Sequence, residues 1–253
     1  MSNPRVVAII QARMAATRLP GKVLADLGGR PALDWVLRRA GRAGLIDQVV
    51  VATTSHSEDD AVAAFCKENE YKYFRGSMQD VLDRYYQASL GAKADIVVRI
   101  TGDCPLIDAD MLDSNIQTFL QADPALDFAA NRLPGDRTIP IGLDNEICTF
   151  AALKTAWTEA KQPHQREHVM PFFYENPERF RTLHIKHKPD YGQYRWTLDT
   201  PEDLTLLRKV VAAFEDDRFS WLDVLALFEA SPELAEINAA VSHKSHLDVD
   251  TRQ

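Results

Sequence analysis

The first half of the chain alternates short apolar runs rich in β-branched residues with amphipathic segments, and this alternation limits the fold more than any other feature. The predicted strands are 6–11, 49–53, 71–74, 96–100 and 127–130. The segments between them carry apolar residues at helical spacing, and Ser57 is expected to cap one of these helices. The pattern predicts an α/β fold whose mostly parallel sheet has helices on both faces and binds ligands at the carboxyl ends of its strands.

The second half of the chain is less regular. Proline and glycine punctuate residues 133–142, and the run 143–150 has no cleanly apolar face, which predicts a strand at an edge or interface of the sheet. We expect one domain over 1–253, with an inserted substrate or dimer subregion at about 131–195 and a disordered tail at 242–253. Further helices are predicted at 151–160, 168–174, 201–214 and 221–229.

The composition is that of an acidic globular protein. Of 253 residues, 45% are hydrophobic, and the formal net charge of −8 argues against a general nucleic-acid partner. The chain has no run of about 18 apolar residues that would predict a membrane span, and its N-terminal segment does not resemble a signal peptide. The three cysteines are scattered without metal-binding spacing, which favours a reducing compartment. Together these features predict a cytoplasmic location.

A basic loop, residues 12–22, follows the first predicted strand. Arg13 and Arg18 can each bind phosphate oxygens with two N–H groups, and Lys22 adds a compact positive charge. The loop is not a Walker loop, because its glycine spacing differs and neither Ser nor Thr follows Lys22. It indicates a triphosphate site, although an ordinary basic surface loop would have the same composition.

Two acidic residues stand where strands end or helices begin. Asp103 follows the strand 96–100 within Arg-Ile-Thr-Gly-Asp-Cys-Pro, and Asp199 lies in Trp-Thr-Leu-Asp-Thr-Pro-Glu-Asp-Leu. Mg²⁺ binds through a few carboxylates together with water and phosphate oxygens, so both residues are candidate ligands. Alternatively, Asp199 or Thr200 caps a helix that begins at Pro201.

These motifs, taken together and in this order, resemble a known family. Gln-Ala-Arg and Thr-Arg-Leu-Pro-Gly-Lys within 11–22, with the motifs at 99–105 and 195–204, are similar to those of the cytidylyltransferases that make CMP-activated sugar acids. These enzymes are the CMP-octulosonate and CMP-acylneuraminate synthetases, and their spore-coat-polysaccharide branch is the most similar. The resemblance covers roughly residues 5–210.

The resemblance implies a function and most of a site. It implies a Rossmann-like sheet of the nucleotide-diphospho-sugar transferase type, with CTP and an acidic sugar as substrates, Mg²⁺ as the cofactor and a homodimeric assembly. Arg13, Arg18 and Lys22 would hold the triphosphate, and Asp103 and Asp199 would bind the metal. Arg13, Lys22 and Asp103 would carry the catalysis.

Further positions are implied for the nucleotide and the acceptor. Relatives read the base and ribose with the loop in which Gly76 and Ser77 stand, although an ordinary turn with Asp80 as a helix cap fits the same residues. Thr54 departs from the family pattern, since the better-known members carry an acid there. The residues expected to face the acceptor are Asp144, Glu146, Arg166, Glu167 and His168.

In the expected reaction, an acceptor hydroxyl attacks the α-phosphate of CTP in line, and the CMP-sugar formed serves surface polysaccharide or glycoconjugate synthesis. Three other interpretations remain open. Asp108-Ala109-Asp110 matches the metal motif of a glycosyltransferase that consumes a nucleotide sugar. The string from His164 to His168 matches a zinc-peptidase motif. A non-catalytic nucleotide-binding protein is the third interpretation, and such a protein would be expected to have lost the basic loop or Asp103.

Overall fold

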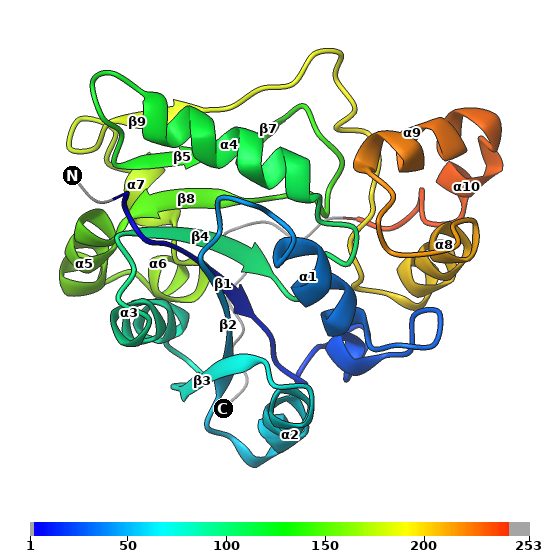
Figure 1. Cartoon of the computed structure of the whole chain (residues 1–253), viewed down its shortest axis with the longest axis horizontal. Coiled ribbons are helices and arrows are strands. Elements are labelled where there is room, and N and C mark those ends of the chain that lie inside the picture. The colour runs from blue at the N-terminus through cyan, green and yellow to red at the C-terminus, as the bar shows by residue number, and fades with distance from the viewer. Residues whose placement is uncertain (1–2, 243–253) are drawn as a thin grey trace.

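The computed structural model describes residues 3–242, which form helices around a seven-stranded sheet (Figure 1). The strand order is β3-β2-β1-β4-β8-β5-β9, and β8 runs antiparallel to both of its neighbours while the other pairs are parallel. This confirms the predicted α/β fold with a mixed, mostly parallel sheet. The strands are β1 (Val6–Gln11), β2 (Gln48–Thr54), β3 (Lys72–Gly76), β4 (Ile96–Thr101), β5 (Phe128–Ala130), β8 (Glu146–Thr149) and β9 (Thr182–His184), and β6 (Arg132–Leu133) pairs separately with β7 (Asp136–Arg137).

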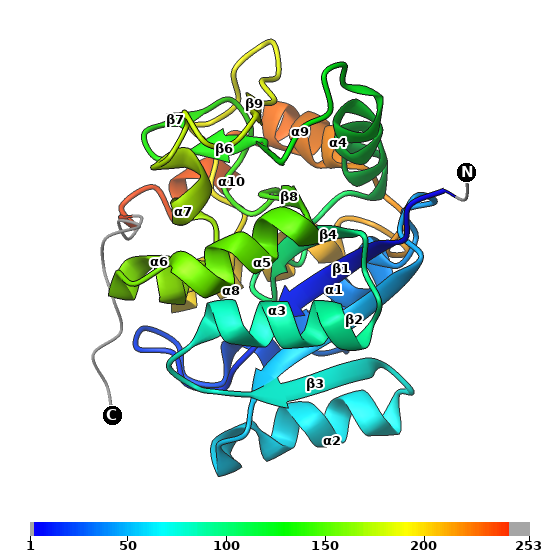
Figure 2. The ribbon, with the colours of Figure 1, turned by 90° about the vertical axis from the view of Figure 1, so that its left-hand side faces the viewer.

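Helices cover both faces of the sheet, as the alternation predicts. Figure 2 views the molecule from the side of α3, α5 and α6. One face carries α1 (Ala32–Ala40), α2 (Asp60–Glu68) and α4 (Ala109–Gln121). The other carries α3 (Val81–Gly91), α5 (Phe150–Glu159), α6 (Pro163–His168) and α7 (Pro171–Tyr174). A third group packs around its own core and consists of α8 (Pro201–Ala212), α9 (Trp221–Ala230) and α10 (Glu233–Glu236).

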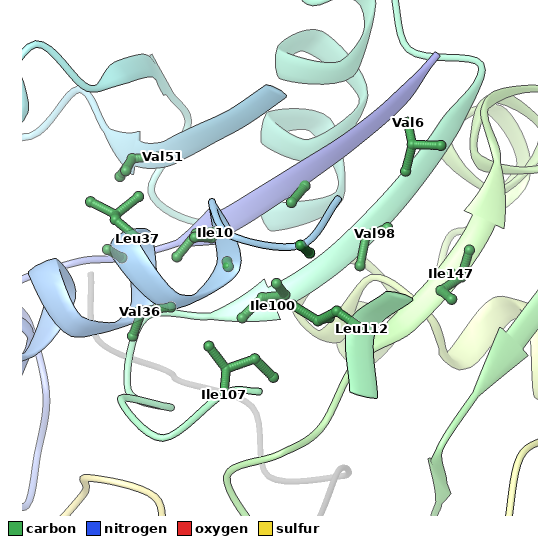
Figure 3. Close-up of a cluster of buried hydrophobic side chains, with 14 of the residues drawn as sticks. Val6, Ile10, Val36, Leu37, Val51, Val98, Ile100, Ile107, Leu112 and Ile147 are labelled. Atoms are coloured by element: carbon green, nitrogen blue, oxygen red, sulfur yellow. The ribbon is translucent and has the colours of Figure 1, made fainter. Parts of the chain in front are cut away.

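The core beneath α1 and α4 shows how strand periodicity buries the sheet (Figure 3). Val98 and Ile100 of β4 belong to this core, whereas Val97 between them belongs to the core on the opposite face. Val36 of α1 and Leu112 of α4 are fully buried with them. Each such aliphatic side chain stabilises the fold by about 1.5–3 kcal/mol on burial. A strand that is buried on both faces needs a continuous apolar run, which is why β4 was visible in the sequence.

The edge position predicted for the strand at 143–150 is wrong. The observed strand, β8, lies inside the sheet between β4 and β5. Its polar residue Glu146 is buried and lies directly opposite Arg99 of β4, with which it forms an ion pair. Opposite charges that face each other across two strands stabilise the pairing. A polar position therefore marks a cross-strand partner here and not an exposed edge.

Two helix predictions also need correction. Residues 168–174 do not form one helix, because Val169 has a φ of 70° and separates α6 from α7. Ser57 does not cap α2, since a 3₁₀ turn, η2 (Ser57–Asp59), precedes that helix. The turn begins after His56, whose ring accepts the N–H of Glu58.

Two further predictions concern residues 131–195 and the tail at 242–253. Residues 131–195 supply β8 and β9 to the main sheet and α5 to α7 to its cover. Of the tail predicted at 242–253, residues 243–253 lie outside the described residues. Within residues 3–242, no helix has the length and apolar character needed to cross a membrane.

Candidate active site

The order of the strands reverses between β1 and β4. The chain adds β2 on one side of β1 and β4 on the other, so the loops that follow β1 and β4 separate at this point of the carboxyl edge. There the N–H of Gly102 donates to the carbonyl oxygen of Gln11 (2.8 Å). A Cβ atom on residue 102 would lie 2.8 Å from that oxygen, so a side chain would push the two loops apart. Gly102 thus allows the loop with Asp103 to lie against the start of the basic loop.

One hydrogen bond ties the basic loop to Asp59 of η2, and another closes the loop on itself. The N–H of Met14 donates to Asp59 Oδ1 (2.6 Å), and the N–H of Gly21 donates to the carbonyl oxygen of Met14 (2.9 Å). Gly21 has a φ of 71°, a left-handed conformation that glycine adopts without strain. The chain then enters the 3₁₀ turn η1 (Lys22–Leu24), which returns Lys22 to the end of β4.

Four of the predicted residues meet in one charged cluster at this edge. Lys22 Nζ lies 2.6 Å from Asp103 Oδ2 and 3.0 Å from Asp199 Oδ1. Arg18 forms an ion pair with the other carboxylate oxygen of Asp199 and donates to the carbonyl oxygen of Ser242 (2.9 Å). The four charged side chains are 13% to 25% exposed, so a ligand can reach them.

The main chain also holds the two carboxylates together. The N–H of Leu198 donates to the carbonyl oxygen of Asp103 (2.8 Å). Helix α8 is capped by Thr200, whose hydroxyl accepts the N–H of Asp203 (3.3 Å). The capping role that the sequence left open between Asp199 and Thr200 therefore belongs to Thr200, and the Asp199 carboxylate faces the cluster.

Electrostatics keep Asp103 ionised. Burial alone would raise the pKa of Asp103, but the charge of Lys22 and hydrogen bonds from Lys22 and Thr101 outweigh burial and bring that pKa to about 2. Burial, followed by the charge of Arg195, lowers the pKa of Arg18. A carboxylate with so low a pKa is a good ligand for a cation and a poor acceptor of a proton near neutral pH.

The cluster fits a divalent cation. The Lys22 ammonium touches both Asp103 and Asp199, so one cation can contact the two carboxylates at once. Mg²⁺ prefers such hard oxygen ligands and completes its coordination with water and phosphate oxygens. Within the described part of the chain, no group of three or more His, Cys, Asp or Glu side chains is placed to hold a metal. A zinc site built from protein ligands alone therefore has no candidate there.

The predicted acceptor residue Asp144 forms an ion pair with Arg137. It pairs with both Nη atoms of Arg137 (2.8 and 3.1 Å). Burial raises the pKa of the Cys104 thiol, and the charges of Asp103 and Asp144 raise it further. Asp144 is therefore close enough to Cys104, the residue that follows Asp103, for its charge to act on the thiol.

The short helix α6 borders the basic loop. Arg13 Nη2 lies 4.0 Å from Glu167 Oε1, and His168 is the last residue of the helix. Arg166 Nε contacts both carboxylate oxygens of Asp80 (3.1 Å each), and Asp80 also caps α3. Glu167 therefore approaches Arg13 of the basic loop.

The predicted acceptor residue Glu146 lies deeper than the rest. It is 2% exposed, forms an ion pair with Arg99 and lies 4.0 Å from Arg132. Its substrate role stays a prediction, and its position indicates a structural one.

We expect Glu146→Gln to lower the free energy of unfolding by about 3 kcal/mol, because it leaves Arg99 buried without its partner charge. Urea unfolding followed by circular dichroism measures the loss. The matched control is Glu159→Gln, which breaks an exposed pair with Arg179 and should change stability far less. Unchanged stability with a raised KM for the acceptor would instead make Glu146 a binding residue.

Gly76 and Ser77 form a well-bonded turn. The carbonyl oxygen of Gly76 accepts the N–H of Ser55 (2.8 Å), and the hydroxyl of Ser77 accepts the N–H of Asp80 (3.1 Å). Asp80 in turn accepts the N–H of Asp83 as the cap of α3 (2.9 Å). The turn and the helix cap that the sequence allowed are both present, and nucleotide binding by Gly76 and Ser77 stays a prediction.

The competing motifs have structural roles. Asp108, the first residue of the possible glycosyltransferase motif, is buried and accepts the N–H groups of Met111 and Trp221 (2.9 Å each) at the start of α4. His164, the first residue of the possible zinc motif, lies 2.8 Å from Glu175. The structure therefore supports neither motif as a metal site.

Three arginines near the predicted site residues were not predicted from the sequence. Arg137 binds Asp144, and Arg132 lies near Glu146. Arg195 Nη2 lies 3.9 Å from Asp199 Oδ2. Only Arg195 had a local signal, as the first residue of the motif at 195–204.

Known proteins share this sequence and fold. A family model described as cytidylyltransferase matches residues 7–238. The spore coat polysaccharide biosynthesis protein SpsF of Bacillus subtilis is 32% identical over 240 residues, which cover 91% of this chain and 96% of that protein. A 3-deoxy-manno-octulosonate cytidylyltransferase of Pelobacter propionicus is 36% identical over 127 residues, which cover 49% of this chain and 48% of that protein. The solved structure of a cytidylyltransferase from Leptospira borgpetersenii has a TM-score of 0.89 and 35% identity, and the match covers 95% of this chain and 100% of that one. The chain therefore belongs to the cytidylyltransferase family.

Proposed function

We propose that the protein transfers CMP from CTP to a hydroxyl group of a sugar acid and releases pyrophosphate. The observation that carries this proposal is the charged cluster at the switch point, where Lys22 bridges Asp103 and Asp199. Strand topology directs nucleotides to this edge of an α/β sheet. The cluster combines cations for a triphosphate with a carboxylate pair for Mg²⁺.

The residues of the cluster divide the work of the reaction. Arg13, Arg18 and Lys22 hold the triphosphate and stabilise the charge that develops on the departing pyrophosphate. Asp103 and Asp199 would hold Mg²⁺, which would supply positive charge where negative charge develops during the transfer. The acceptor oxygen forms a bond to the α-phosphorus while the bond from that phosphorus to the pyrophosphate oxygen breaks. Asp103, with a pKa of about 2, is a poor acceptor for the hydroxyl proton that is released in this step.

A group of paired charges on and around β8 supports an acidic acceptor. Three cations, Arg99, Arg132 and Arg137, pair there with two carboxylates, Asp144 and Glu146, so this group has one positive charge in excess. Arginine binds a carboxylate well, since its planar N–H groups match the two oxygens. The octulosonate cytidylyltransferase relative has a sugar acid in its name, which supports the same acceptor class.

We also propose a biosynthetic role, a location and an oligomeric state for the enzyme. The name of the Bacillus subtilis relative supports a role in surface polysaccharide or glycoconjugate synthesis. The scattered cysteines support a cytoplasmic location, and the resemblance to the CMP-sugar-acid synthetases supports a homodimer. Light scattering after size exclusion tests the dimer, and a monomer at micromolar concentration would contradict it.

Nucleotide choice is the first test of the proposal. With Mg²⁺ present, CTP should raise Tm more than ATP, GTP or UTP, because a ligand that binds only the folded state stabilises that state. At a CTP concentration of about 100 times Kd, the gain is about 2.7 kcal/mol. Pyrophosphate release across the four nucleotides and a panel of sugar acids then identifies the acceptor. A larger shift with UTP or with a nucleotide sugar would move the protein to another transferase class.

A further inference from the structure

The carboxylate of Asp203, in the first turn of α8, gathers N–H donors from three segments of the chain. Asp203 is fully buried. Its Oδ1 accepts Arg195 Nε (2.9 Å) and Asn238 Nδ2 (2.8 Å). Its Oδ2 accepts Arg195 Nη2 (2.9 Å) and the backbone N–H groups of Asp199 (2.9 Å) and Thr200 (3.0 Å). One carboxylate therefore binds five N–H groups.

Asp203 accepts more hydrogen bonds than a helix cap requires. Helix α9 has the same kind of capping box, in which Ser220 accepts the N–H of Asp223 and Asp223 binds back to Ser220. Asp223 is exposed and needs no further support to complete its cap. In α8, the additional donors come from Arg195 and from Asn238, which follows α10.

The carboxylate that accepts these additional bonds also holds the backbone of Asp199, one member of the proposed metal-binding pair. Asp203 holds the backbone N–H of Asp199, while the side chain of Asp199 contacts Lys22 and Arg18. Asn238 also donates to the carbonyl oxygen of Arg195 (3.0 Å), which ties the segment before Asp199 to the same carboxylate. The network thus fixes the backbone on which the Asp199 carboxylate is mounted.

We propose that Asp203, held by Arg195 and Asn238, is a positioning residue that keeps the Asp199 carboxylate opposite Asp103 for a shared divalent cation. The inference rests on the proposed function, because the cation site belongs to it. A cation with only two protein ligands depends on both being in place beforehand, since any freedom left to Asp199 must be lost on binding.

The test compares Asp203→Asn and Asn238→Ala with the matched control Asp223→Asn, which alters the capping box of α9. Mn²⁺ serves as the probe, and electron paramagnetic resonance measures its affinity in the absence of nucleotide while Tm is recorded in parallel. Residues that orient metal ligands typically change metal affinity by about 10- to 100-fold, so Asp203→Asn should weaken Mn²⁺ binding by about 10-fold or more. Asn238→Ala should also weaken Mn²⁺ binding, by a smaller factor. Asp223→Asn should lower Tm and leave Mn²⁺ affinity unchanged.

The measurements distinguish a positioning role of Asp203 from a helix-capping role alone. A lowered Tm with wild-type Mn²⁺ affinity in both Asp203→Asn and Asn238→Ala would reduce the network to a helix cap and overturn the inference. If Asp203→Asn does not fold, Asn238→Ala alone decides, because it removes two peripheral bonds and leaves the ion pair of Arg195 and Asp203 intact. Failure of the wild-type protein to bind Mn²⁺ would refute the proposed metal site itself, and the inference with it.

Discussion

Asp103→Asn and Asp199→Asn are each expected to lower turnover by roughly 10²- to 10³-fold while the protein remains folded. Both carboxylates contact Lys22 in the cluster, and a shared metal ion would further make these two residues, distant in sequence, act as one unit. The double variant should be scarcely worse than the worse single variant, because residues that serve one metal are strongly non-additive. Pyrophosphate release measures the turnover, and titration with Mg²⁺ measures the accompanying loss of metal affinity.

A surface acid provides the control for these variants. Asp216→Asn alters an exposed side chain at the end of the α8 region and should leave both turnover and Mg²⁺ affinity unchanged. Normal turnover in Asp199→Asn, accompanied by a lower Tm, would show that Asp199 only supports the start of α8. Additive losses in the double variant would mean that the two carboxylates act separately.

Lys22→Met is expected to change nucleotide and metal binding in opposite directions. The variant loses a charge-assisted contact to phosphate worth about 1.5–3 kcal/mol, so CTP should bind roughly 10- to 150-fold more weakly while CMP changes little. Lys22 also lies between Asp103 and Asp199, in contact with both carboxylates. Removing this competing cation should therefore tighten the binding of Mg²⁺ alone. Isothermal titration with CTP, CMP and Mg²⁺ separately gives the three affinities.

The matched control for this variant is Lys209→Met, which removes an exposed lysine of α8 and should alter none of these affinities. Equal losses for CTP and CMP would show that Lys22 does not contact the phosphates beyond the first. Weaker binding of Mg²⁺ alone would show that Lys22 does not compete for the carboxylates.

The same variant should change how stability depends on pH. The pKa of Asp103 is about 2 in the folded protein, against an ordinary value of about 3.9 for an unfolded chain. A depressed pKa means that ionised Asp103 stabilises the fold above about pH 4, and that this contribution is lost as the pH falls through about 2. Burial raises the pKa of Asp103 in the absence of Lys22, so Lys22→Met should be destabilised at neutral pH and should converge with the wild-type protein near pH 2. Thermal unfolding across that range measures the difference, and parallel curves would contradict it.

The sequence determined the central sheet and the loops that bear the site. β1 and β4 are buried on both faces, so each had to be a continuous apolar run, and such a run is legible in the chain itself. The basic loop and Asp103 follow those two strands directly, so locating the strands also located Lys22 and Asp103 at the carboxyl edge. The strands and helices can be located from short stretches of sequence, because the positions of their buried side chains repeat with a fixed period.

Only the tertiary structure decided which charges meet. Glu146 was read as a polar residue of an edge strand, yet it faces Arg99 inside the sheet, because a distant strand supplies the charge that compensates its burial. Asp199 and Thr200 were equal candidates for the helix cap, and the fold assigned the cap to Thr200 while Asp199 turned toward Lys22. The energy of an ion pair depends on the distance between two side chains and on their burial, and neither quantity is encoded in the sequence around one residue. The period of a strand shows which face is buried, and the topology of the whole sheet determines what that face meets.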